Sequence, residues 1–103
     1  MKYHGPIVIK FYLPGCPLCQ AFRPFYDDIA LASADWGGVT IAAFDCSQNK
    51  LWCIEVANIN QTPTIRYLRP GDKLNTKGQD YLLPAEFSDD TVENFHEWLG
   101  KVI

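Results

Sequence analysis

The sequence predicts an α/β fold in which a central mixed β-sheet of about four strands is flanked by helices on both faces. Short runs of β-branched and aromatic residues recur along the chain, and Pro or Gly residues bound them. Between these runs, apolar residues return every three or four positions, which is typical of one face of a helix. The runs and the periodic segments follow one another in the order β-α-β-α-β-β-α.

The first strand is predicted over residues 7–13, a near-continuous apolar run typical of a buried central strand. Pro14-Gly15 ends it, and a helix is expected from residue 16 or 17 to about residue 33. Pro17 suits the first turn of this helix, whereas Pro24 lies inside it and is expected to kink it. The apolar residues of the helix share one face: Phe22, Phe25, Tyr26, Ile29 and Ala30.

A turn at 36–38 leads into a second strand, which is predicted over residues 39–44. A short helix is expected over residues 47–58, with Ser47 as a candidate N-cap. We expect its apolar face to hold Leu51, Ile54, and Val56 or Ala57.

The third strand is predicted over residues 64–68, and Arg66 within it is expected to be exposed. A polar turn separates it from a fourth strand over 79–83, which pairs back as a hairpin. The acidic stretch at 88–90 predicts the start of a final helix, because carboxylates suit a helix N-terminus. One face of that helix carries Val92, Phe95, Leu99 and Val102.

The composition excludes two classes of protein. The chain has 9 Lys and Arg residues against 12 Asp and Glu and a net charge of −3, with no basic stripe, which argues against a nucleic-acid partner. No apolar stretch approaches the ~20 residues of a membrane span, so no membrane association is expected. We therefore expect residues 1–103 to form a single soluble domain and a monomer, which could be a piece of a longer protein.

The four cysteines form two closely spaced pairs, a C-x-x-C at Cys16 and Cys19 and a C-x6-C at Cys46 and Cys53. An even count suits two disulfides, one metal site, or one redox pair with one structural pair. A zinc site would require both pairs to converge on one ion. The first pair instead opens an amphipathic helix directly after a buried strand, which favours a redox dithiol over zinc and predicts no metal.

Cys16-Pro17-Leu18-Cys19 lies where the first predicted strand ends and the first helix begins. A helix N-terminus presents unpaired N–H groups and a partial positive charge, both of which stabilise a thiolate. Cys16 is therefore the candidate nucleophile. Cys19, one helical turn later, is placed to resolve a mixed disulfide formed on Cys16.

With these motifs, the chain resembles the thioredoxin superfamily. The matching features are Phe11-Tyr12, the C-x-x-C motif, Pro24 in the active-site helix, and Thr62-Pro63-Thr64, which matches the family's cis-proline loop. X-Pro is the one common cis peptide, so a cis bond before Pro63 is expected. The resemblance implies a thioredoxin-like fold in which Thr62 and Pro63 shape a groove for the substrate backbone.

Asp45-Cys46 and Cys53, followed by the proline loop, are most similar to catalytic domains of protein disulfide isomerases and to the thioredoxin domain of quiescin sulfhydryl oxidases. The resemblance implies a structural disulfide between Cys46 and Cys53, although two buried free thiols would also fit the sequence. A stable second disulfide would be unexpected in a reducing cytosol. It would favour the endoplasmic reticulum lumen or secretion over the cytoplasm.

The implied activity is thiol–disulfide exchange with protein substrates, as an oxidoreductase or isomerase of the secretory pathway. The alternatives are a cytosolic disulfide reductant and a client-binding module with an idle dithiol. We expect no cofactor within this domain, because the dithiol itself carries the electrons, whereas a sulfhydryl oxidase would hold its FAD in another domain. Leu18 and the stretch 82–84 could add an apolar rim that grips unfolded clients.

Several residues depart from the family pattern, and all of them bear on the tuning of the dithiol. Lys10 stands six residues before Cys16, where family members hold a buried acid that relays a proton to the resolving cysteine. Lys10 could simply snorkel or pair, or its cation could favour thiolate over thiol. Gly15 replaces the usual aromatic residue, and Pro17-Leu18 leaves no histidine between the cysteines to stabilise the thiolate.

Overall fold

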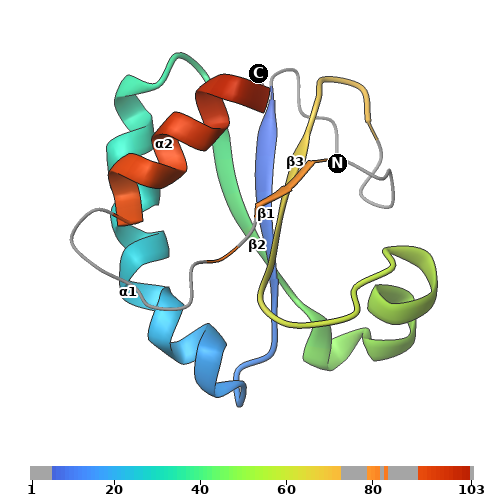
Figure 1. The fold of residues 1–103 in the computed structure, drawn as a ribbon. Coiled ribbons are helices and arrows are strands. Elements are labelled where there is room, and N and C mark those ends of the chain that lie inside the picture. Colours follow the sequence, from blue (N-terminus) through green and yellow to red (C-terminus); the bar gives the residue numbers. More distant parts are fainter. Residues whose placement is uncertain (1–5, 73–78, 82, 84–90, 103) are drawn as a thin grey trace.

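Four strands form one mixed sheet. This computed structural model describes residues 6–72, 79–81, 83 and 91–102. Its strands are β1 (Ile7–Tyr12), β2 (Thr40–Asp45), β3 (Thr64–Leu68) and β4 (Gln79–Tyr81). Their spatial order is β2-β1-β3-β4, with β2 parallel to β1 and with β3 antiparallel to both β1 and β4. The predicted mixed sheet is therefore confirmed, and the first apolar run is a central strand (Figure 1).

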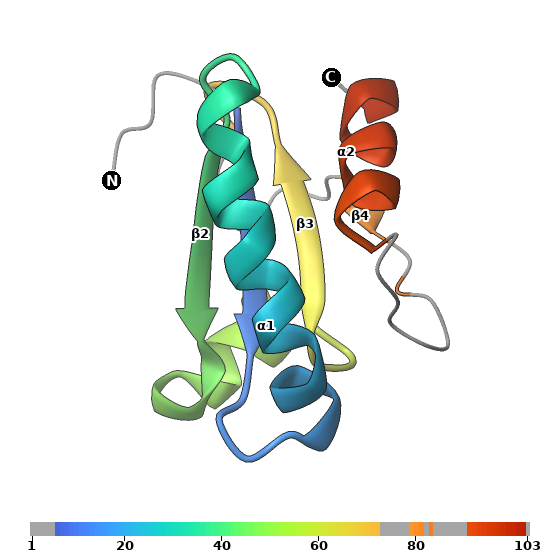
Figure 2. The same ribbon diagram turned by 90° about the vertical axis from the view of Figure 1, so that its left-hand side faces the viewer.

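Both α-helices cover the same face of this sheet. α1 (Pro17–Ala32) runs along β1 and continues into a 3-10 turn, Ser33–Asp35, while α2 (Thr91–Val102) packs beside α1 on the side of β4 (Figure 1, Figure 2). Since side chains alternate between the two faces of a strand, only every second strand residue meets these helices. The resulting apolar cluster centres on Val8, Phe22, Ile29, Ile65, Phe95 and Leu99.

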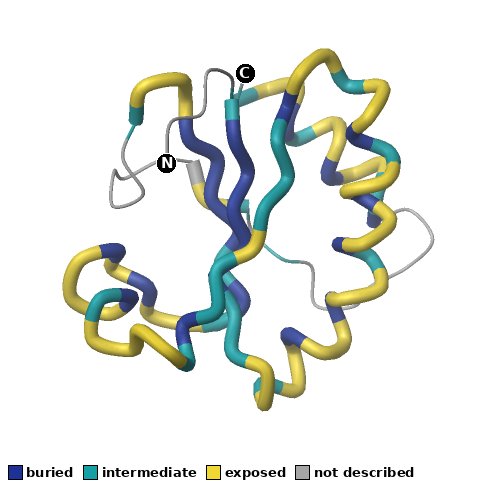
Figure 3. Tube along the Cα trace, turned by 180° about the vertical axis from the view of Figure 1, so that it is seen from behind, coloured by how far each residue is buried: buried dark blue, intermediate teal, exposed yellow. Residues whose placement is uncertain are grey.

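The opposite face is covered by the segment that joins β2 to β3. It contains a 3-10 turn, η2 (Cys46–Gln48), and a turn of π-helix, η3 (Trp52–Val56), where the sequence predicts one short helix over 47–58. Figure 3 shows how the two central strands are buried between this segment and the α-helices. The second apolar cluster lies here and consists of Ile7, Ile9, Phe11, Cys46, Cys53, Ala57, Ile59 and Leu68.

Two details of the joining segment differ from the prediction. Ser47 is not an N-cap, because the Asp45 carboxylate caps η2 by accepting a hydrogen bond from the Ser47 N–H at 2.8 Å. Cys53 and Ala57 face the sheet, and a disulfide from Cys53 to Cys46 holds them there. Cys53 and Ala57 are four residues apart and so share one face of the turn, and the disulfide links that face to Cys46. Of the apolar residues expected to face the core, Leu51, Ile54 and Val56 are exposed, whereas Ala57, the alternative to Val56, is buried as expected.

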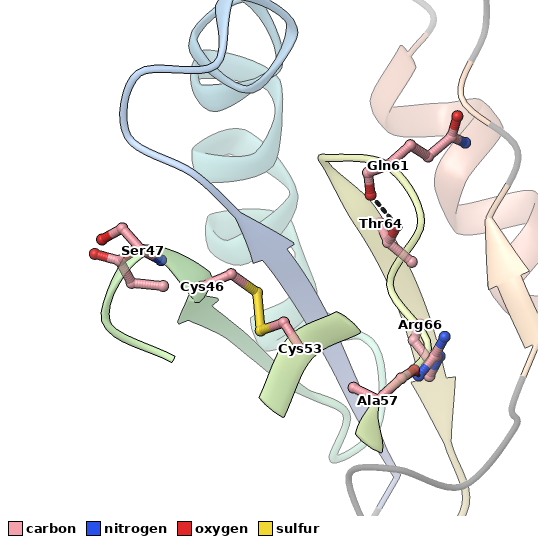
Figure 4. The surroundings of a disulfide bond; sticks show 8 residues. Cys46, Ser47, Cys53, Ala57, Gln61, Thr64 and Arg66 are labelled. Atoms are coloured by element: carbon pink, nitrogen blue, oxygen red, sulfur yellow. Dashed lines mark hydrogen bonds between the residues drawn. A yellow bond between two sulfur atoms is a disulfide. The ribbon is translucent and has the colours of Figure 1, made fainter. Parts of the chain in front are cut away.

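Arg66 in β3 is buried, which corrects the expectation of an exposed strand position. Its guanidinium donates to the Ala57 carbonyl at 2.7 Å (Figure 4) and to the two carboxylate oxygens of Asp80 at 2.9 and 3.3 Å. It also lies 5.5 Å from the centre of the Phe11 ring. Arg66 is tolerated inside because these groups satisfy its charge, and the bonds join β3 to β4 and to the end of η3.

The C-terminal helix is confirmed, whereas the fourth strand is shorter than predicted, because residue 83 lies outside it. β4 covers the first three residues of the strand predicted over 79–83, whereas residue 82 and the helix start predicted at 88–90 lie outside the described residues. In α2, Phe95 and Leu99 are buried as expected. Among the described residues, no helix has the length and apolar character needed to cross a membrane.

Candidate functional site

Cys16 caps the N-terminus of α1, directly after the loop that leaves β1. Its backbone is extended, with φ of −75° and ψ of 120°, and its Sγ accepts a hydrogen bond from the Cys19 N–H at 3.3 Å. That N–H belongs to the first turn of the helix and has no partner within the helix. The loop is held by the Cys16 N–H, which donates to the Leu13 carbonyl, and by the Gln20 side chain, which donates to the Pro14 carbonyl.

The surroundings of Cys16 favour its thiolate. Partial burial acts to raise the pKa of the Cys16 thiol, but hydrogen bonds from the Cys19 thiol, the Thr62 side chain and the N–H groups of Cys19 and Leu18 outweigh it and lower the pKa below its ordinary value. The protonated thiol also donates to the Thr62 carbonyl at 3.4 Å. Cys16 thus combines partial exposure with a lowered pKa, the two properties of a reactive cysteine.

Cys19 is in the opposite situation. It lies one turn further along α1, is 4% exposed, and carries a free thiol like Cys16. Burial, and after it the neighbouring Cys16, raise the pKa of the Cys19 thiol. A buried thiol is shielded from external reagents, yet Cys19 is adjacent to Cys16. It can therefore attack a disulfide formed on Cys16 but not one free in solution.

Thr62 and Pro63 lie in the loop before β3. The peptide bond between them is cis, as the motif predicts. The hydrogen bond from Cys16 to the Thr62 carbonyl joins residues that are 46 positions apart in the sequence. Within the loop, the Thr64 hydroxyl donates to the Gln61 carbonyl at 2.6 Å (Figure 4). The fold therefore brings the proline loop and the dithiol together.

Two grooves flank the proline loop. One, of about 320 Å³, is lined by apolar groups and by the buried disulfide: Leu13, Ile54, Ile59, Cys46 and Cys53. The other, of about 350 Å³, lies on the side of β4 and is mainly polar: Asn58, Asn60, Gln61, Thr64 and Asp80. Leu18 is 45% exposed in the first turn of α1 and adds an apolar side chain between the two cysteines. The dithiol is thus bordered by both apolar and polar surface.

Lys10 is buried beneath α1, which rules out the snorkelling interpretation. Its exposed fraction is 7%, and its ammonium lies 4.6 Å from the centre of the Tyr26 ring and 5.1 Å from that of Tyr12. Burial lowers the pKa of Lys10, against the opposing influence of the negative charges of Asp27 and of an ionised Cys19. The structure therefore places a cation next to the second cysteine of the C-x-x-C motif.

Cys46 and Cys53 form a disulfide, with a sulfur–sulfur distance of 2.11 Å (Figure 4). They are 3% and 2% exposed and lie in the second apolar cluster. The alternative of two free buried thiols is therefore wrong, and the four cysteines do not converge on one ion. In the part of the chain that the structure describes, no group of three or more His, Cys, Asp or Glu side chains is arranged to hold a metal.

The sequence profile of the thioredoxin family matches residues 1–82. The chain belongs to the thioredoxin family. It is 31% identical over 93 residues to a protein disulfide-isomerase of Drosophila melanogaster and 30% identical over 103 residues to protein disulfide-isomerase A2 of Homo sapiens. These alignments cover 90% and 98% of this chain but 16% and 18% of the relatives, so the chain spans less than a fifth of their length.

Solved structures show the same fold. Full-length ERdj5 superposes with a TM-score of 0.74 and 19% identity, over 99% of this chain and 14% of that one. The first two thioredoxin domains of Saccharomyces cerevisiae Eps1p give a TM-score of 0.69 and 20% identity, over 91% of this chain and 34% of that one. The thioredoxin fold predicted from the motifs is thereby confirmed, with a free cysteine pair at the N-terminus of its first helix.

Sequence reasoning missed two charged residues near Cys19. Arg23 and Asp27 line the same cavity as Cys19 and Lys10, on the side of α1 next to the apolar stripe. The sequence does indicate that these residues are neighbours, because Cys19, Arg23 and Asp27 are spaced four residues apart and so share one face of a helix. Only the structure shows that this face meets Lys10.

Proposed function

We propose that this chain is a protein thiol–disulfide oxidoreductase that exchanges disulfides with client proteins through Cys16 and Cys19. The observation that carries the proposal is the asymmetry of the two thiols. Cys16 is partly exposed, caps α1 and has a lowered pKa, whereas Cys19 is buried and has a raised pKa. One thiol is thus equipped to react with an external sulfur atom, and the other to react only inside the site. The protein disulfide-isomerase relatives support the same activity.

Thiol–disulfide exchange with a client proceeds in two steps. The Cys16 thiolate attacks one sulfur of a client disulfide, forms a mixed disulfide and releases the other client sulfur as a thiolate. Cys19 then attacks Cys16, which forms the Cys16–Cys19 disulfide and releases the second client thiolate. The client disulfide is reduced and the two cysteines are oxidised. The reverse sequence oxidises a client dithiol, and neither direction requires a cofactor in this chain.

Extended protein chains are the substrates that the surface favours. The Thr62–Pro63 loop lies against Cys16 between two grooves, and exposed Leu18 offers an apolar contact beside it. A client segment that crosses the loop would bring its sulfur to Cys16. The buried Cys46–Cys53 disulfide fits an oxidising compartment such as the endoplasmic reticulum lumen or the cell exterior.

The test compares the chain with two matched variants, Cys16→Ser and Cys19→Ser, in the reduction of insulin by the fully reduced protein. We expect Cys16→Ser to lose the activity. Cys19→Ser should still make the first attack and accumulate a mixed disulfide with insulin, visible on a non-reducing gel. Reduction by Cys16→Ser at the parent rate would refute the proposal. Insulin binding by the parent without any exchange would show a client-binding module instead.

A further inference from the structure

Lys10 and Cys19 line one cavity of about 370 Å³ between the sheet and α1. β1 contributes Lys10 and Tyr12, and α1 contributes Cys19, Arg23 and Asp27. A buried lysine and the buried member of a dithiol thus face the same half-open cavity. The family pattern has a buried acid at the position of Lys10, so a cation there is specific to this sequence.

The ammonium of Lys10 is held by aromatic rings rather than by a carboxylate. Its ammonium makes cation–π contacts with Tyr26 and Tyr12, and among the described residues no salt bridge includes Lys10. The neighbouring strands present no charge to it, since β2 contributes Ala43 to the cavity and β3 pairs Ile65 with Lys10. Within the cavity, the anions that can attract this positive charge are therefore Asp27 and a Cys19 thiolate.

Burial acts on the two groups in opposite directions. It raises the pKa of Cys19 and lowers the pKa of Lys10, because both charged forms lose water. Their mutual attraction opposes this, since an ionised Cys19 raises the pKa of Lys10. Asp27 favours the charged lysine, and Arg23, on the same helix, disfavours it. Each of the two buried groups is therefore easier to ionise when the other is charged.

We propose that Lys10 is a positioning residue for the second step of exchange, in which its ammonium stabilises the thiolate that Cys19 must become. This inference rests on the proposed function. Cys19 loses its proton to solvent, and its Sγ attacks the Sγ of Cys16 in the mixed disulfide. The bond from Cys16 to the client sulfur breaks, the Cys16–Cys19 bond forms, and the client sulfur leaves as a thiolate. Lys10 keeps its proton throughout.

The expected gain in rate is modest, and it depends on pH. When the pKa of a thiol falls by one unit, the thiolate fraction below the pKa rises about tenfold, but each thiolate reacts about threefold more slowly. The net gain at neutral pH is therefore about threefold. The gain disappears as pH rises, because Cys19 ionises without help and Lys10 loses its own charge.

The experiment measures the second step alone. Fully reduced protein is mixed with glutathione disulfide, quenched with acid at successive times, and analysed by mass spectrometry for the glutathione adduct on Cys16. We expect Lys10→Met to resolve this adduct about threefold more slowly than the parent near neutral pH, with the difference closing towards alkaline pH. Lys10→Arg keeps the charge and should retain the parent profile. Lys101→Met, an exposed position in α2, is the matched control and should change nothing.

Three results would overturn the inference. They are a parent-like rate for Lys10→Met, a loss of rate by the same factor at every pH, and a Lys10→Arg that is as slow as Lys10→Met. Lys10→Met removes a buried charge, so we expect it to fold, and its thermal melt checks this. If Lys10→Arg does not fold, the pH dependence of Lys10→Met decides alone. Failure of the proposed function looks different, because no glutathione adduct would form on the parent.

Discussion

Removal of the Cys46–Cys53 disulfide should destabilise the fold without stopping exchange. A disulfide restricts the unfolded chain, and for a sequence separation of 7 residues the chain-entropy relation gives about 2.4 kcal/mol at 25 °C. That value is a large part of the stability of a domain of this size. Because both sulfurs are buried in the second apolar cluster and neither belongs to the dithiol, opening the bond should leave the dithiol chemistry in place.

The sharpest form of this test uses the two single variants together with the double variant. Either Cys46→Ala or Cys53→Ala breaks the bond completely, so each should cost nearly as much as Cys46→Ala/Cys53→Ala. Two unbonded buried cysteines would give losses that add instead. The three variants should therefore fall within about 0.5 kcal/mol of one another.

Urea unfolding followed by circular dichroism measures these losses. At a denaturant dependence of about 1–3 kcal/mol per molar, the midpoint should fall by about 1–2 M. The adduct assay with glutathione disulfide then checks that exchange persists. Equal stability of parent and double variant would refute the reasoning, as would loss of exchange in a double variant that remains folded.

Three further perturbations test individual contacts. Tyr26→Phe removes a hydroxyl that donates to carbonyls of β1 and β2 and should cost about 1 kcal/mol. Burial raises the pKa of Tyr26 above 10.0, so the parent should lose stability as pH rises beyond about 10, and Tyr26→Phe should lose less. Thermal melts at increasing pH measure this, and an equal loss of stability with pH in both proteins would contradict it. Leu18→Ser should raise the KM for insulin about threefold and leave exchange with glutathione unchanged. Leu31 is 77% exposed near the other end of α1, and Leu31→Ser should change neither the KM for insulin nor the exchange with glutathione. Equal effects of Leu18→Ser and Leu31→Ser would show that Leu18 does not contact the client. Asp80→Ala leaves the buried guanidinium of Arg66 with a single hydrogen-bond partner, the Ala57 carbonyl. Because Asp80 is 46% exposed, the loss should be only about 1–2 kcal/mol in urea unfolding, and an unchanged midpoint would show that water replaces the carboxylate.

The strands and the long helices could be predicted because their local patterns agree with their tertiary environment. The apolar run of β1 is central, α1 follows the predicted bounds closely, and β3 coincides with the predicted 64–68. The segment between β2 and β3 could not be predicted in the same way. There exposed Leu51 and Ile54 stand at helical spacing as well, so the apolar pattern does not show that the buried face is the one with Cys53 and Ala57.

The candidate site was predictable in its identities but not in its electrostatics. The C-x-x-C spacing after a predicted strand indicated that Cys16 begins a helix and that Cys19 lies in its first turn. The structure has this arrangement. The neighbours of Lys10 were not predictable, because its ring contacts and cavity come from β1, β2 and α1 together. Arg66 shows the same limit. Whether an arginine is buried depends on a partner such as Asp80, which lies 14 residues away.

The two faces of β1 explain why two cysteine pairs in one chain differ so much. Lys10 points to the face covered by α1, where Cys19 lies in a cavity with charged groups and Cys16 meets the helix N-terminus. Phe11 points to the other face, where the disulfide is packed in an apolar cluster. A thiolate is stabilised by cations and N–H groups, and an apolar environment denies it both. The first pair is therefore placed to ionise, as the proposed exchange requires, while the second is buried where a thiolate is not favoured.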